Sequence, residues 1–383
     1  MLGEAERPTR TRTVFPGLTA AQYTDPDVFE LERERIFDRQ WFCVGRSEEL
    51  PERGSFIRRD VPGDSLLLTR DLDGAIHAFY DVCRHRGSVL VEEAAGQVRK
   101  AFTCPYHAWV YGLDGRLLGT PNVHADDGLD RDAYGLREIG VEEWDGYLFV
   151  SHAAPDARPD LHANLAREPD EPLSYGRFEI GELRLGHRIT YEVEANWKIV
   201  WENYNECLHC PGVHPELAQM VPLFRRGLVA DDDDPTVLAT LADGYDAFTL
   251  SGTTSLPHLP GLDPIDARTY YGAGVFPNLM INMRATGVTS FTLFPRAVDH
   301  TTVVSDYLYR PETIASADFD PSEMIAFLDL VARQDWEVCA LAQRGARSKG
   351  FDRSVYPPQE RYVHMFAERY REELGSSRSS AAR

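Results

Sequence analysis

The tripeptide Cys83-Arg84-His85, followed after eighteen residues by Cys104-Pro105-Tyr106-His107, says more about the fold than any other part of this sequence. Two Cys-plus-His pairs can hold a [2Fe–2S] cluster, with two thiolates on one iron and two imidazoles on the other. Because neutral imidazoles replace two thiolates, such a cluster has a raised reduction potential. The same four side chains can instead bind a structural zinc ion.

The residues around both pairs favour the cluster over zinc. Ala75–Asp81 and Val110–Leu118 have the composition of β-strands, and the hairpin-forming dipeptides Asp73-Gly74 and Asp114-Gly115 accompany them. Each pair is therefore expected at the tip of a loop in an all-β module. The spacing Cys-x-His…Cys-x-x-His resembles the Rieske ferredoxin motif.

The first 172 residues otherwise read as one helix, several strands and a linker. A helix is predicted over Asp25–Gln40, with Asp25 as its N-cap and Pro26 in its first turn. The polar, proline-rich stretch Ala153–Pro172 is predicted to be a linker. The further strands expected here are Trp41–Gly45, Ser55–Val61, Ser65–Arg70 and Tyr147–Ser151.

The second half mixes long helices with strands. Apolar residues at helical spacing predict a helix from Asn196 through Leu208, ended by Pro211-Gly212. Pro222–Pro264 is irregular, a stretch suited to covering a pocket, and the tail after Gly375 is of low complexity and expected to be disordered. Strands are predicted at Leu185–Ala195, Thr269–Ala273, Leu279–Arg284, Val288–Leu293 and Thr301–Tyr309, and helices at Ser322–Arg344 and Gln359–Glu373.

Composition indicates a globular enzyme. The chain has 383 residues, enough for two domains, with 43% hydrophobic and 26% charged residues. It has no apolar run long enough to span a membrane and no secretory signal, which predicts a cytoplasmic protein without membrane contact. The net charge of −21 argues against nucleic acid as a partner. The run Asp231–Asp234 is expected to be a solvated loop.

The six cysteines divide into two cluster candidates and four others. In a reducing compartment the four others, Cys43, Cys207, Cys210 and Cys339, are expected to be free thiols. Cys207 and Cys210 form a C-x-x-C motif, which can also act as a redox dithiol.

A second metal constellation surrounds that motif. His209 and His214 are five residues apart, and Pro211-Gly212 between them lets the chain bend so that both rings converge. The apolar stripe of the helix Ser322–Arg344 includes Asp335, a carboxylate that is costly to bury unless it is paired or binds metal. Two histidines and one carboxylate form the facial triad of non-haem ferrous iron enzymes. Asp329, on the flank of the same helix, is the alternative carboxylate.

In combination these motifs resemble the catalytic α-subunits of Rieske non-haem iron oxygenases over nearly the whole chain. The resemblance implies an α+β fold, with an all-β Rieske [2Fe–2S] domain and a helix-grip catalytic domain in which an antiparallel sheet packs against helices. The implied divisions are an N-terminal helical segment packed on the catalytic domain (1–40), the Rieske domain (41–152), the mononuclear iron domain (153–375) and a disordered tail (376–383). The motifs that carry the resemblance are Cys83-Arg84-His85-Arg86-Gly87, Cys104-Pro105-Tyr106-His107-Ala108-Trp109, Asn196-Trp197-Lys198, Glu202-Asn203-Tyr204, Glu206, His209, His214 and Gln334-Asp335.

The resemblance also implies roles for these residues. Glu206, three residues before His209 and so on the same helical face, would bridge the iron site to the cluster of a neighbouring subunit in a homotrimer. Electrons would come from NAD(P)H through a separate reductase, since the sequence has no glycine motif for a flavin or nicotinamide. The implied ligands are Cys83, His85, Cys104 and His107 for the cluster, and His209, His214 and Asp335 for the mononuclear iron.

Two departures from the wider family bear on function. Glu206 stands where ring-hydroxylating dioxygenases usually carry Asp, and this setting is similar to the branch that oxidises carnitine, choline and glycine betaine. Ala108 stands where many relatives have Gly, and is expected to tighten that loop.

The resulting hypothesis is an O₂-dependent monooxygenase that hydroxylates or N-demethylates a small quaternary ammonium compound such as a betaine. The alternatives are an aromatic-ring or natural-product hydroxylase or dioxygenase with the same iron centres, and a Rieske electron-transfer protein without oxygenase activity. Aromatic faces suit a quaternary ammonium head. The candidates for that cage are Tyr204, Tyr270, Tyr271, Phe276 and Phe291.

Overall fold

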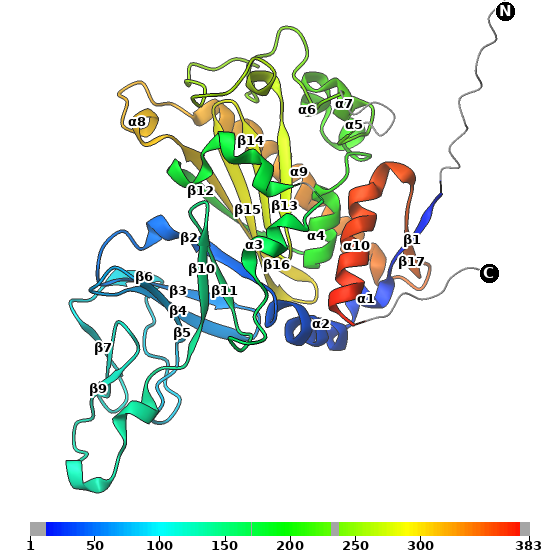
Figure 1. Cartoon of the computed structure of the whole chain (residues 1–383). Coiled ribbons are helices and arrows are strands. Elements are labelled where there is room, and N and C mark those ends of the chain that lie inside the picture. Colours follow the sequence, from blue (N-terminus) through cyan, green and yellow to red (C-terminus); the bar gives the residue numbers. More distant parts are fainter. Residues whose placement is uncertain (1–12, 170, 231–236, 376–383) are drawn as a thin grey trace, which may run out of the picture.

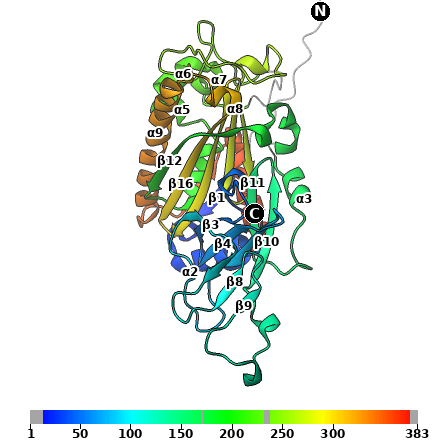
Figure 2. The same cartoon turned by 90° about the vertical axis from the view of Figure 1, so that its left-hand side faces the viewer.

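A computed structural model describes residues 13–169, 171–230 and 237–375 (Figure 1). The expected acidic loop at Asp231–Asp234 and the expected disordered tail lie outside these residues. Two large antiparallel sheets are stacked along the molecule, and helices cover the second (Figures 1 and 2). The α+β fold expected from the sequence is confirmed.

The first half of the chain forms the all-β module. Its seven-stranded sheet has the order β2-β11-β10-β5-β4-β3-β6, and a small sheet, β7-β8-β9, carries the second Cys-plus-His pair. The strands are β2 (Phe42–Arg46), β3 (Ser55–Val61), β4 (Asp64–Arg70), β5 (Ile76–Tyr80), β6 (Ala95–Gln97), β7 (Ala101–Thr103), β8 (Val110–Gly112), β9 (Leu117–Gly119), β10 (Glu138–Trp144) and β11 (Tyr147–Ser151).

The second half forms a five-stranded antiparallel sheet of order β12-β16-β15-β14-β13. One face packs on β2 and β11 of the first sheet, where Ile281 and Met283 join Trp41 and Phe149 in a buried cluster. Helices α4 and α9 lie on the other face, which carries the functional site. Figure 2 shows α9 beside β12 and β16. The elements are β12 (Arg184–Val193), α4 (Trp197–Tyr204), β13 (Tyr271–Val275), β14 (Leu279–Arg284), β15 (Gly287–Ala297), β16 (His300–Tyr309) and α9 (Ser322–Ala346).

The N-terminal helices pack against the helical layer of this second half. Asp25 caps α2 as predicted, since its side chain accepts from the Asp27 amide at 2.9 Å. The α-helix is shorter than expected because a π-helical turn, Arg33–Phe37, replaces its second half. Glu32 and Lys198 form a fully buried ion pair at 2.6 Å, which joins α2 to α4. The other elements here are β1 (Phe15–Thr19), α1 (Ala20–Thr24), α2 (Pro26–Glu32), β17 (Arg353–Tyr356) and α10 (Arg361–Glu373).

Two predicted elements differ from the structure. The helix that begins after Asn196 ends at Tyr204, where the Asn205 side chain donates to the Trp201 carbonyl at 2.8 Å. Pro211 therefore does not help to end that helix; it lies in the first turn of a separate one, a position that tolerates its missing N–H. The predicted linker contains a helix, α3 (Leu161–Ala166), because its two leucines pack into the core below the second sheet.

Short helices complete the description. The short α-helices are α5 (Cys210–Val213), α6 (Pro215–Met220), α7 (Pro222–Arg225) and α8 (Pro311–Ile314), and the 3-10 turns are Ser47–Glu49, Ala125–Asp127, Arg131–Tyr134, Pro172–Phe178, Ile180–Glu182, Asp266–Arg268 and Pro358–Glu360. Of the helices in the described residues, none is long and apolar enough to cross a membrane.

Candidate metal centres

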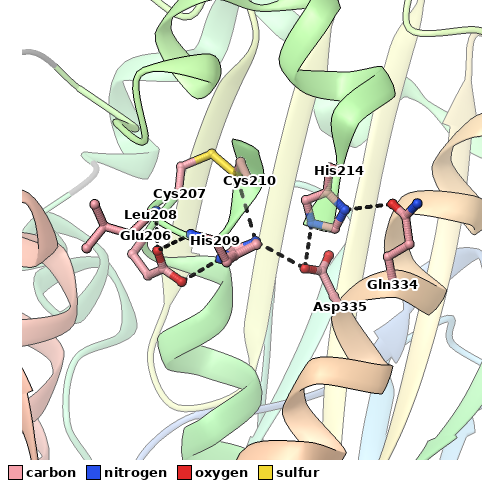
Figure 3. Close-up of a disulfide and its surroundings, with 8 residues drawn as sticks. All are labelled: Glu206, Cys207, Leu208, His209, Cys210, His214, Gln334 and Asp335. Atoms are coloured by element: carbon pink, nitrogen blue, oxygen red, sulfur yellow. Dashed lines mark hydrogen bonds and ion pairs between the residues drawn. A yellow bond between two sulfur atoms is a disulfide. The ribbon is translucent and has the colours of Figure 1, made fainter. Parts of the chain in front are cut away.

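Three of the predicted ligands meet on the helical face of the second sheet. Asp335 Oδ1 lies 2.9 Å from His214 Nε2 and 3.3 Å from His209 Nε2 (Figure 3). One ligand atom of each residue lies within 4.8 Å of the other two. Two imidazoles and one carboxylate at this spacing fit a ferrous ion held from one side.

The local fold explains how histidines five residues apart converge. His209 immediately precedes α5 and His214 immediately follows it, so one short helical turn brings the two rings to 5.1 Å between centroids. Asp335 reaches them from the long helix α9. His214 is almost fully buried, whereas His209 is partly exposed.

Each imidazole is held on its second nitrogen by a side chain outside the cluster. Glu206 Oε1 lies 2.5 Å from His209 Nδ1, and Gln334 Oε1 lies 2.7 Å from His214 Nδ1 (Figure 3). These partners fix the ring orientations so that both Nε2 atoms face Asp335. The sequence indicated Gln334 only as the neighbour of Asp335 in a motif, and its contact with His214 was not predicted.

The four candidate cluster ligands also meet, at the loops of the all-β module. Cys83 and Cys104 are buried, while the rings of His85 and His107 lie 4.6 Å apart near the surface. Each loop closes with an amide of residue i+4 donating to the cysteine carbonyl at 3.0 Å, from Gly87 and from Ala108. Both residues have positive φ, 76° and 56° respectively. Buried thiolates with outward-facing imidazoles suit a [2Fe–2S] cluster that exchanges electrons through its histidine side.

Comparison with known families decides between the cluster and zinc. Residues 40–139 match the Rieske [2Fe–2S] domain, and residues 180–376 match the catalytic domain of the ring-hydroxylating α-subunit family. The chain belongs to the Rieske oxygenase α-subunits. It therefore carries the two metal centres of that family, a Rieske cluster and a mononuclear iron, and the zinc and electron-carrier alternatives are set aside.

Similar proteins lie in the quaternary ammonium branch of this family. The oxygenase subunit of glycine betaine monooxygenase from Chromohalobacter salexigens is 30% identical over 369 residues, covering 87% of this chain and 80% of the relative. The oxygenase subunit of carnitine monooxygenase from Escherichia coli is 28% identical, covering 87% and 85%. The crystal structure of a quaternary ammonium Rieske monooxygenase with L-carnitine has a TM-score of 0.72, 25% identity and coverage of 94% and 96%.

Electrostatics at the iron site of this Rieske oxygenase suit a cation. Burial alone would lower the pKa of His209, but hydrogen bonds to Asp335 and Glu206 outweigh it and raise that pKa to about 10. Burial would raise the pKa of Asp335, but hydrogen bonds to His209 and His214 hold it below its usual range. A divalent ion could be bound by this carboxylate and by both Nε2 atoms at the same time.

Glu206 does not lie on a helix with His209, contrary to the prediction. Residues 205–209 form a non-helical turn, because α4 has already ended. The Leu208 and His209 amides both point to Glu206 Oε2, and Oε1 meets the imidazole of His209. The contact with His209 is thus made through a turn that the carboxylate itself stabilises.

Cys207 and Cys210 are joined by a disulfide, so the prediction of free thiols is wrong for these two (Figure 3). The turn that leads into α5 brings their Cα atoms to 4.9 Å, within the range that a disulfide spans. The prediction used the compartment and not this geometry. Cys43 and Cys339 are free and buried.

A cavity of about 120 Å³ opens beside the three iron ligands. Tyr204, Tyr270 and Phe291 line it, whereas Tyr271 and Phe276 are absent from its lining. The hydroxyl of Tyr271 donates to Asp266 at 2.8 Å, and Phe276 packs against Trp197 and Trp201. The further lining residues are Asn203, Glu206, Cys207, His209, Cys210, His214, Leu217, Phe224, Val229, Phe248, Asn282, Arg284, Leu328, Val331, Ala332, Asp335 and Trp336.

The irregular stretch expected to cover a pocket contributes to this cavity. Phe224, Val229 and Phe248 all come from Pro222–Pro264 and line it. Their contribution was not predicted residue by residue, because an irregular stretch has no periodicity that shows which side chains point inward. Trp336 and Arg284 were also missed as lining residues, although Trp336 lies within a predicted helix and Arg284 ends a predicted strand.

Proposed function

We propose that this oxygenase oxidises an N-methyl carbon of a small quaternary ammonium compound such as a betaine, by N-demethylation or hydroxylation. The observation that carries the proposal is the 30% identity with glycine betaine monooxygenase oxygenase subunits over 87% of this chain. Bound iron supplies the reductive activation of O₂ in this chemistry. The chain supplies the ligands, the proton arrangement, the orientation of substrate and the exclusion of water.

The proton arrangement follows from the contacts around the rings. Glu206 accepts the Nδ1 proton of His209, and Gln334 accepts that of His214, which leaves both Nε2 lone pairs for iron. His209, His214 and Asp335, which line the cavity, would hold the iron and leave it open to substrate and O₂.

The lining of the cavity suits a compact cation with methyl groups. Phe291 packs edge-on against Trp336, with 5.7 Å between the ring centroids. Trp336 directly follows the iron ligand Asp335 in the sequence. Cation–π attraction is worth about 0.5–2 kcal/mol for each favourable contact. We assign the substrate methyl groups to the part of the cavity formed by Phe291 and Trp336. Glu206, His209, His214 and Asp335 remain the catalytic and metal-ligating set.

Electrons are proposed to enter from a neighbouring subunit of a homotrimer. The cluster loops lie beside β7 and β9, at the end of the molecule opposite α5 and its iron ligands (Figures 1 and 2). Glu206 contacts His209 and is partly exposed, so it can also meet the cluster histidine of a second chain. A separate reductase, fed by NAD(P)H, is implied because the relatives are oxygenase subunits.

A second candidate is a hydroxylase or dioxygenase of an aromatic or natural-product substrate. The apolar side chains Phe224, Leu217, Leu328 and Val331 favour it, because they line the same cavity without offering charge. Such a substrate would have no N-methyl group to release as formaldehyde.

Turnover with defined substrates separates the two candidates. The iron-loaded protein, a generic reductase and NADH are assayed for O₂ uptake and formaldehyde release with glycine betaine, carnitine, choline, proline betaine and aromatic acids. Formaldehyde in proportion to O₂ with a betaine-type compound supports the proposal. Uptake only with aromatic acids would move the substrate to the second candidate.

A further inference from the structure

Arg284 is a buried charge in the cavity that the iron chemistry does not use. It ends β14, is 8% exposed and lines the cavity together with Asn282. Residues two apart on a strand share a face, so both point to the helical side of the sheet. One guanidinium nitrogen, Nη1, donates to Thr289 Oγ1.

The charge of Arg284 has no carboxylate partner. Among the residues that the structure describes, no Asp or Glu forms an ion pair with it, and its buried Nε has no hydrogen-bond acceptor. The polar groups around it include the hydroxyls of Tyr270, Tyr307 and Tyr204, which are uncharged at neutral pH. Burial lowers the pKa of Arg284.

Two other arginines of the described chain show the usual arrangement. The buried Arg46 pairs with Glu48 at 2.8 Å, and the half-buried Arg188 pairs with Asp306 at 2.5 Å. A buried charge without a partner is costly, so a site that keeps one is built for a ligand of opposite charge. The planar guanidinium, with a free Nε, is suited to grip a carboxylate by two parallel hydrogen bonds.

The guanidinium also restricts where a substrate cation can lie. It stacks over the rings of Phe248 and Tyr270, with its carbon 5.4 and 5.5 Å from their centroids. These two faces are therefore occupied by a cation of the chain itself. The charge of Arg284 repels a substrate ammonium, whereas the carboxylates of Asp335 and Glu206, which line the same cavity, attract it.

We infer that Arg284 binds the carboxylate of the substrate and so turns the ammonium end toward the iron ligands. The inference rests on the proposed function, and it narrows the substrate class to molecules with a carboxylate as well as an N-methyl cation. Choline, which lacks the carboxylate, is then a poor ligand. Arg284 acts as a specificity-determining residue for the orientation of substrate.

The test compares binding of acids and an alcohol to Arg284→Gln. Anaerobic, iron-loaded full-length protein is titrated calorimetrically with glycine betaine, L-carnitine and choline. The wild type should bind the two acids at least about 30-fold more tightly than choline, as expected for a buried charge pair. Arg284→Gln should bring all three affinities close together. Arg284→Lys, which keeps the charge and loses the fork, should restore part of the preference and serves in its place if the glutamine variant does not fold.

Arg296→Gln is the matched control. Arg296 lies on the same sheet and also stacks over a ring, that of Phe294 at 5.2 Å, but it does not line the cavity. It should leave the preference for acids unchanged. An equal preference in the wild type and in Arg284→Gln would overturn the inference.

The outcomes also separate this inference from the proposed function. If ammonium compounds are demethylated but Arg284→Gln binds the two acids as tightly as the wild type does, the inference fails and the proposed function stands. If no ammonium compound binds, yet an aromatic carboxylate binds in a manner that requires Arg284, the role of Arg284 in binding carboxylates stands and the proposed function fails.

Discussion

At the scale of single residues, Glu206 contacts the imidazole of His209 and is itself partly exposed at the surface. Replacing it by Gln keeps the size of the side chain and removes the charged acceptor of His209 Nδ1. Mutation of a side chain that hydrogen-bonds to a metal-bound histidine typically lowers metal affinity or activity by about 10- to 100-fold. We predict that Glu206→Gln folds, keeps its cluster spectrum and loses O₂ uptake by a factor in that range. Unchanged uptake would show that Glu206 neither orients His209 nor carries electrons.

Ala108 is a second residue whose own backbone conformation affects stability. Its φ of 56° is the left-handed conformation that favours glycine. Ala108→Gly relieves this strain, although the unfolded chain gains entropy in return. We predict a gain in the free energy of unfolding of up to about 1 kcal/mol, seen as a higher thermal midpoint of the cluster-containing protein. A lower midpoint for Ala108→Gly would contradict this prediction. Gly74→Ala is the control for the opposite change, because it places a side chain at a positive φ of 97°.

How far the sequence predicted the site depends on whether a residue has a local signal. The metal-ligand candidates stand in motifs whose spacing a reader can recognise, and the structure brings His209, His214 and Asp335 together. Arg284 and Phe248 have no such signal, because a strand end and an irregular loop meet only in the folded chain. The Cys207–Cys210 disulfide was missed because its closeness arises from a turn where a helix was expected.

At the scale of elements, a buried carboxyl ties three segments together. Glu202 on α4 accepts hydrogen bonds from Tyr23 of α1 at 2.8 Å and from Tyr356 of β17 at 2.9 Å. Burial outweighs both bonds and raises the pKa of Glu202 to about 7 from its ordinary 4.5. The folded protein therefore holds this proton more tightly than the unfolded chain does.

The contribution of that proton to stability is full below pH 4.5 and is lost as the pH rises through about 7. Glu202→Gln is uncharged at every pH and removes this dependence. Unfolding measured by urea for both proteins from pH 5 to 8 should show the wild type losing up to about 3 kcal/mol relative to the variant. Parallel pH profiles would contradict the assignment.

The sequence predicted most elements and placed fewer of their ends. β3, β11 and β14 have the predicted bounds because alternation and turn residues define them locally. The helix after Asn196 was extended too far, since its apolar spacing continues past the point where the Asn205 side chain caps it. The helix α3 was missed because its leucines are buried by distant strands and not by neighbours in sequence.

At the scale of the whole molecule, the proposed electron transfer between chains can be tested through the separation of the two metal centres within one chain. The cluster loops and the helix α5 lie at opposite ends (Figure 1). Two inactive variants, Cys83→Ser without a cluster and His209→Ala without the iron site, are co-expressed with different tags. Mixed assemblies purified through both tags should regain turnover, because an intact cluster can face an intact iron site across an interface. Transfer within one chain would leave every mixed assembly inactive.

We propose that Asp335 completes the mononuclear iron site, and the iron content of its alanine variant is the measurement that checks this assignment. Asp329 on the same helix is the control, because Tyr191 and Arg333 bind it at 2.7 and 2.8 Å and it is not in the cluster of ligands. Iron per chain and the visible spectrum are measured for the wild type, Asp335→Ala and Asp329→Ala. We expect about three, two and three irons per chain, with the cluster spectrum the same in all. If Asp335→Ala kept its third iron and its turnover, Asp335 would not be an iron ligand.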